Sequence, residues 1–68
     1  MTPKQAQQAQ VWARYHKASE LLADATDEFI RAEQSRRAGL LGNTARYEQI
    51  ATGALAEYRA ARAAMESL

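Results

Sequence analysis

The chain has no cysteine, a single histidine, one proline and three glycines among its 68 residues. Without cysteine it has no disulfide, no thiolate metal site and no cysteine nucleophile. One histidine excludes a metal site that needs several histidine ligands. Because so few residues disfavour helix, the composition favours an all-helical chain.

Long apolar runs and an excess of one charge are missing as well. No stretch approaches the roughly 20 apolar residues of a membrane span. The glutamine-rich N-terminus lacks the apolar segment of a signal peptide, so we expect a cytoplasmic protein without a membrane association. Nine Lys and Arg against eight Asp and Glu leave a net charge of +1. This balance argues against nucleic-acid binding through bulk charge.

The apolar content of 47% includes sixteen alanines, which bury little surface. A chain of this length forms one domain over residues 1–68. Its core is expected to be thin, so a partner is expected to contribute to its stability.

The first expected helix covers residues 3–38. Thr2 is placed to cap it, Pro3 suits the first helical position, and Gln5 completes a capping box. Gly39 supplies the left-handed residue that ends many helices. Residues 39–43 are expected to form the turn.

The second expected helix covers residues 44–66, with Asn43 or Thr44 as its cap. Both helices carry apolar residues at alternating spacings of four and three, which is typical of a coiled-coil seam. The seam residues are Val11, Tyr15, Ala18, Leu22, Ala25, Phe29 and Ala32 in the first helix and Tyr47, Ala51, Ala54, Tyr58, Ala61, Met65 and Leu68 in the second.

A tight turn with antiparallel helices sets large seam residues against small ones. In this register Phe29 faces Ala54, Tyr58 faces Ala25, and Tyr15 meets the C-terminal end of the second helix. The sequence therefore predicts an all-α, antiparallel two-helix hairpin with an alanine-rich, coiled-coil-like seam. Dimerisation into a four-helix bundle would cover the sides that a hairpin leaves open.

The same register leaves the first ~11 residues of the longer helix, about 16 Å, beyond the end of the second helix. Val11 and Trp12 then lack a partner within the chain, and an exposed aromatic residue often marks a protein interface. The alternative is that Trp12 lies against its own helix.

Further candidate contact residues flank the seam. Ala23 and Ile30 continue the stripe from Trp12 along the first helix, and Leu55 lies on the corresponding flank of the second. The back of the second helix is a ridge of small residues that would let another helix approach closely, or else ordinary alanine-rich surface. Its candidate contact residues are Gly53, Ala56 and Ala60.

Groups for catalysis do not converge in this pattern. His16 falls on the polar side of its helix, and the neighbouring acids are matched by bases, including an Asp27–Arg31 pair at i,i+4. We therefore expect no enzyme activity, no cofactor and no metal. The expected partner is another protein, of all-α structure, or a second copy of the chain.

Two other functions stay open. A small inhibitor or regulator, for example phage-encoded, that docks on a host protein would use the same surfaces. A dimeric RNA- or DNA-binding regulator is the alternative from another class. Its basic residues would be Lys4, Arg14, Lys17, Arg31, Arg36 and Arg37, but acidic residues lie among them.

Residues from about Arg31 to Leu68 carry a family resemblance. A long helix ends in the basic-then-glycine turn Arg36-Arg37-Ala38-Gly39, and Tyr47-Glu48-Gln49 precedes an alanine-rich amphipathic run. In these features the chain resembles the small YscE/PscE family, helical-hairpin co-chaperones of the needle subunit in type III secretion. The resemblance implies pairing with a tetratricopeptide-type chaperone, so that the two together keep the needle protein monomeric in the cytoplasm before export.

Overall fold

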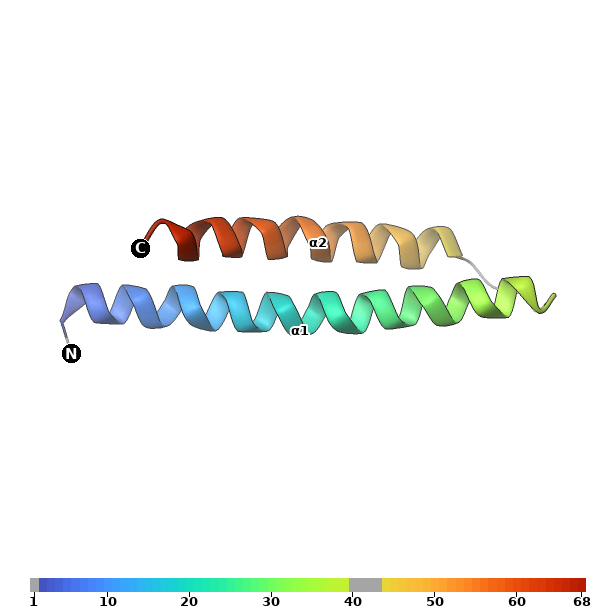
Figure 1. Cartoon of the computed structure of the whole chain (residues 1–68), viewed down its shortest axis with the longest axis horizontal. Coiled ribbons are helices and arrows are strands. Elements are labelled where there is room, and N and C mark those ends of the chain that lie inside the picture. Colours follow the sequence, from blue (N-terminus) through green and yellow to red (C-terminus); the bar gives the residue numbers. More distant parts are fainter. Residues whose placement is uncertain (1, 40–43) are drawn as a thin grey trace.

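The computed structural model describes residues 2–39 and 44–68. Helix α1 (Pro3–Arg37) and helix α2 (Thr44–Glu66) lie side by side and antiparallel (Figure 1). Together they form a rod of 56 × 15 × 13 Å. The predicted all-α helical hairpin is confirmed.

The predicted capping box at the start of α1 is present. The backbone N–H of Gln5 donates to the Thr2 hydroxyl over 3.2 Å, and the Thr2 N–H donates to the Gln5 side-chain oxygen over 3.0 Å. Pro3 occupies the first helical position. At the other end Gly39 has a φ of 81°, the left-handed conformation expected just past a helix end.

Helix α2 begins at Thr44 and continues through Gly53 without a break. The other predicted cap, Asn43, lies outside the described residues, as do the turn positions 40–42. At the end of the helix the N–H and the hydroxyl of Ser67 both donate to the carbonyl of Ala63, over 3.1 and 2.9 Å.

The seam between the helices is the one that the heptad pattern predicts. Every predicted seam residue except Leu68 is buried or half-buried. The buried residues of the described chain are all alanines, namely Ala18, Ala25 and Ala61, of which Ala61 has no exposed surface. A centre made of alanines brings two helices close together but buries little apolar area. Larger apolar side chains are therefore left at its edges.

The predicted register of the two helices is wrong. Tyr58 does not lie opposite Ala25. Instead its ring packs against Tyr15, with centroids 5.6 Å apart. Helix α2 is thus displaced by about one heptad toward the N-terminus of α1. As a result α1 extends beyond both ends of α2 rather than only at its N-terminus (Figure 1).

The error has a simple physical cause. Sliding one helix by seven residues returns seam positions to seam positions, so apolar periodicity does not distinguish registers that differ by a heptad. The predicted register assumed a tight turn. Helix α1 ends at Arg37 and α2 begins at Thr44. Six residues of any chain can span at most about 20 Å, at about 3.3 Å per residue, so this separation in sequence is compatible with a displacement of ~10 Å.

Candidate functional site

Two apolar grooves run along the hairpin, on different sides of the seam. We call them the Leu55 groove and the Leu21 groove, and their linings share no residue. Leu21 belongs to one and Thr26 to the other; five residues apart on a helix, these side chains point about 140° away from each other. The hairpin therefore offers two separate surfaces to partners.

The Leu55 groove has a volume of about 430 Å³. The Thr52 hydroxyl at its edge donates to the carbonyl of Glu48 over 2.9 Å, so this polar group is satisfied within α2. Because its larger side chains are only half-buried by the hairpin, the groove presents apolar area to a partner. Its lining is Leu22, Thr26, Phe29, Glu48, Ala51, Thr52 and Leu55.

The Leu21 groove has a volume of about 310 Å³ and is the more apolar of the two. Leu21 is 50% exposed and Ile50 is 45% exposed at its edges. A Cβ placed on Gly53 would meet no atom within 4 Å, so the groove is open above this glycine. The lining is Ala18, Leu21, Ala25, Ile50, Gly53, Ala54 and Glu57.

Leu21 and Ile50 are not among the contact residues predicted from the sequence. The signal was available in the same heptad pattern. Leu21 follows the seam residue Ala18 by three positions, and Ile50 follows the seam residue Tyr47 by three, which places each on the seam's edge. The apolar stripe that begins at Trp12 runs along the opposite flank of the seam, so it does not include these two residues.

An ion pair closes one end of the Leu21 groove. Arg14 donates from Nε and Nη2 to the two carboxylate oxygens of Glu57, over 2.7 and 3.2 Å. This bidentate hydrogen bonding raises the pKa of Arg14 and lowers the pKa of the Glu57 carboxyl from 4.5. Both side chains are about half exposed, so the pair orients the helices more than it stabilises them.

Two tyrosines join the helices next to this ion pair. The hydroxyls of Tyr15 and Tyr58 lie 3.3 Å apart, and their rings are tilted by 36°. The hydrogen bond to Tyr15 raises the pKa of the Tyr58 phenol. This contact identifies the register of the structure, because it joins one defined position on each helix.

Trp12 does not lack an intrachain partner, which corrects the prediction. Its ring stacks on His16, with centroids 5.8 Å apart, and meets Tyr15 edge-on at 6.1 Å. The alternative interpretation, in which Trp12 lies against its own helix, describes this arrangement. Trp12 is nevertheless 46% exposed, and its neighbour Val11 is half-buried.

The structure divides the remaining predicted contact residues between different surfaces. Leu55 is half-buried in the groove named after it, whereas Gly53 lines the Leu21 groove. Ile30 is 48% exposed on α1. The small residues Ala23, Ala56 and Ala60 are exposed.

Several ionisable side chains form ion pairs on the outer surface. The predicted Asp27–Arg31 pair is present at 2.9 Å, and His16 is exposed. Within residues 2–39 and 44–68, no three His, Cys, Asp or Glu side chains are grouped closely enough to hold a metal ion. Neither helix of this part of the chain is long and apolar enough to cross a membrane.

No family model matches the chain, and no curated protein or solved structure is significantly similar to it.

Proposed function

We propose that the chain is a non-catalytic protein-binding adaptor that receives a helix of another protein in the Leu55 groove. The observation that carries this proposal is the half-buried apolar lining of the groove, where Leu22, Phe29 and Leu55 surround a shallow hollow. A helix of the partner that covers these side chains gains about 25 cal/mol for each Å² of apolar surface removed from water.

Two exposed apolar residues would extend this contact along α1. Ile30 is one helical turn from Thr26 of the groove, and Trp12 presents nearly half of its surface near the N-terminal end. Tryptophan is among the residues that most often contribute large binding energies at protein interfaces. The partner helix is therefore expected to lie along α1 and to contact Trp12 or Ile30 in addition to the groove.

A role without chemical turnover agrees with the polar groups of this groove. Among the described residues that line it, Glu48 alone is ionisable, and the backbone carbonyl of Glu48 accepts the Thr52 hydroxyl. Catalysis usually requires several polar groups that converge on one point. Recognition by apolar burial requires only the exposed area and a complementary shape.

In a narrower form, we propose a cytoplasmic co-chaperone that works with a tetratricopeptide-type chaperone on a type III secretion needle subunit. Support comes from the resemblance of the region 31–68 to the YscE/PscE family. The helical hairpin agrees with the architecture that this resemblance implies. In this role the chain would help cover apolar helix surface of the needle protein until export.

Co-purification with paired variants tests the proposal. In one experiment the chain is co-expressed and purified with the tetratricopeptide-type chaperone and needle subunit encoded in the same genome. In a second it is purified from its native host, and mass spectrometry identifies the proteins retained with it. Leu55→Gln should reduce recovery of a helical partner at least tenfold, because it places an amide in the groove. The matched control is Leu21→Gln, which changes the other groove and should leave recovery unchanged.

Two outcomes would contradict the proposal. Equal recovery of every partner with Leu55→Gln and with the unchanged chain would exclude the Leu55 groove. Retention of RNA or DNA, with binding that falls steeply as salt rises, would instead support the nucleic-acid alternative, since phosphate contacts release counterions. A protein complex held by apolar burial should tolerate the same increase in salt.

A further inference from the structure

The Leu21 groove lies on a side of the hairpin that the proposed adaptor function does not use. Leu21 and Ile50 are exposed at its edges. The charged side chains beside Leu21 are arranged in an order that is complementary to itself.

Five residues of α1 occur at alternating spacings of three and four, so they share one face of the helix. From the N-terminal side this face presents two cations, then leucine, then two anions. The residues in order are Arg14, Lys17, Leu21, Asp24 and Glu28. If an identical helix is placed antiparallel over this face and centred on Leu21, cations lie opposite anions on both sides of the centre. A parallel copy would set like charges against each other.

From this pattern and the groove we propose that two copies of the chain associate through their Leu21 grooves, with α1 antiparallel to α1 of the second copy. The twofold axis passes near Leu21. Each Lys17 then lies opposite Asp24 of the second copy, and each Arg14 lies opposite Glu28. Such an interface is closed, because the same surface of each copy contacts the other.

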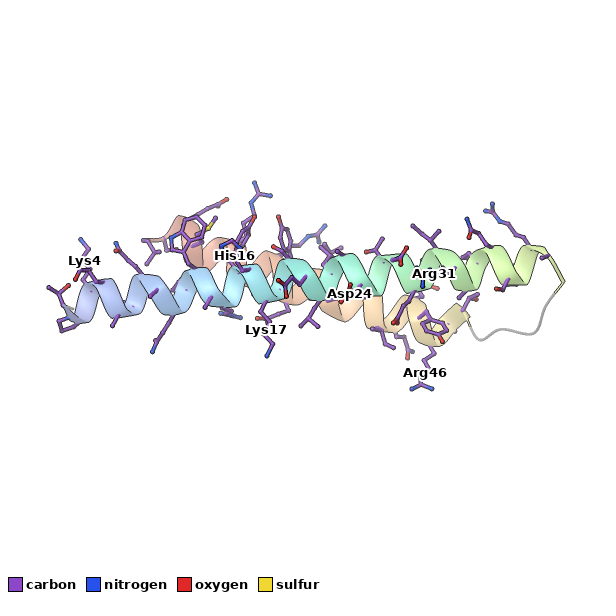
Figure 2. All side chains as sticks on the ribbon, turned by 90° about the horizontal axis from the view of Figure 1, so that it is seen from below. Lys4, His16, Lys17, Asp24, Arg31 and Arg46 are labelled. Carbon is purple, nitrogen blue, oxygen red and sulfur yellow. The ribbon has the colours of Figure 1, made fainter. Side chains whose placement is uncertain are left out.

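The inner charged residues are available for this role. Among residues 2–39 and 44–68, ion pairs within 4.0 Å occupy Arg14, Asp27, Arg31 and other residues, but neither Lys17 nor Asp24. Both side chains are exposed. In Figure 2, Lys17 and Arg46 extend to one side of the hairpin and His16 extends to the opposite side. Lys17 therefore points away from the side that carries His16 and the Trp12 ring stacked on it. Leu21 of the groove follows Lys17 by four residues, one helical turn, and so shares its face of α1.

The groove itself has the shape that this association needs. Ala18, Leu21 and Ala25 line it from α1, so its centre lies at the level of Leu21. In the antiparallel dimer Leu21 of each copy reaches the groove of the other at this level. Gly53 forms part of the opposite wall, and no atom lies within 4 Å of the position of its missing Cβ. The α2 backbone can therefore come close to the second copy.

The mass in solution tests the association directly. Sedimentation equilibrium from about 1 µM to 1 mM should show a change from 7.6 kDa to twice this mass. Leu21→Ala should raise the dissociation constant at least tenfold. The matched control is Leu68→Ala, since Leu68 is 48% exposed at the C-terminus and lies outside the groove; it should leave the constant unchanged.

A charge exchange tests the antiparallel arrangement. Lys17→Glu alone, or Asp24→Lys alone, should raise the dissociation constant about tenfold, because each creates two like-charge contacts across the twofold axis. The double variant restores both contacts and should return to within about threefold of the unchanged chain. Lys17 and Asp24 are seven residues apart on one helix, about 10 Å, so this rescue does not arise within a single copy. Circular dichroism of each variant establishes that the helices are intact.

Several results would overturn the inference. One is a mass of 7.6 kDa throughout the concentration range, and another is a mass greater than that of a dimer. A third is a dissociation constant of the double variant as high as those of the single variants. Each is independent of the adaptor proposal, which depends on the other groove.

Discussion

The contact between Tyr15 and Tyr58 distinguishes the register in the structure from the one that the heptad pattern predicts. We expect the two tyrosines to be energetically coupled. The perturbation is leucine at each position, singly and together, because leucine keeps apolar bulk and helix propensity but removes the aromatic ring and the hydroxyl. The free energies of unfolding of the unchanged chain, the two single variants and the double variant together give the interaction energy between the two side chains.

The magnitude follows from the geometry. Rings with centroids 5.6 Å apart contribute about 0.5–1.5 kcal/mol beyond the area that they bury. The hydroxyl contact, 3.3 Å long and partly buried, adds a hydrogen bond of about 0.5 kcal/mol, at the weak end of the usual range. The expected coupling energy is therefore about 1–2 kcal/mol. A second set of variants with phenylalanine at both sites keeps the rings and removes the hydroxyls. Its coupling energy should equal only the smaller, hydrogen-bond contribution.

Urea unfolding followed by helical circular dichroism gives the four free energies. The measurement is repeated at tenfold lower protein concentration, so that self-association does not contribute. A second cycle pairs Tyr58 with Phe29. In the predicted register these residues occupy adjacent layers and should couple, whereas in the structure they lie about 16 Å apart along the rod and should not. Coupling of Phe29 with Tyr58 but not of Tyr15 with Tyr58 would refute the register described here.

Three further outcomes follow from single positions. Ala61→Leu should lower the free energy of unfolding by about 1–3 kcal/mol, because this alanine is fully buried between the helices. The control is Ala63→Leu at an exposed position, which should change stability by less than about 0.5 kcal/mol. Thermal unfolding compares the two variants. Thr2→Ala should cost about 0.5–1 kcal/mol and increase amide exchange in the first turn of α1. Since Arg14 lowers the folded-state pKa of Glu57 from 4.5, the pair's contribution is complete above pH 4.5 and is lost as the pH falls through the folded-state pKa. Glu57→Gln should accordingly reduce the loss of thermal stability on acidification.

Local and periodic features of this fold were predictable from the sequence. The capping box at Thr2 and the left-handed Gly39 depend on short-range hydrogen bonds and on backbone sterics. The seam depends on a repeat that each helix carries by itself. These features needed no knowledge of how one helix lies against the other.

The register and the surfaces that depend on it were not predictable in this way. Tyr58 meets a seam residue whether it lies opposite Ala25 or near Tyr15, and the heptad repeat does not separate the two arrangements. The Leu21 groove is recognised only when the edges of both helices are considered together, since Leu21 and Ile50 belong to different helices. The predicted register left Trp12 without a partner, whereas its own helix supplies ring contacts from Tyr15 and His16.

Gly53 allows the fold and the proposed dimer to be tested with one substitution. Glycine in a helix interior lowers stability by about 1 kcal/mol relative to alanine. A Cβ at position 53 would meet no atom within 4 Å in the hairpin, so alanine fits there. Gly53→Ala should therefore stabilise the single hairpin by about 1 kcal/mol, measured by urea unfolding at low concentration. It should also weaken the dimer, because the added methyl group would lie where the second copy approaches, and sedimentation would show this. Gly39→Ala is the contrasting control and should destabilise, since its φ of 81° disfavours a Cβ. If Gly53→Ala stabilised the hairpin and strengthened the dimer together, close approach at this position would be wrong.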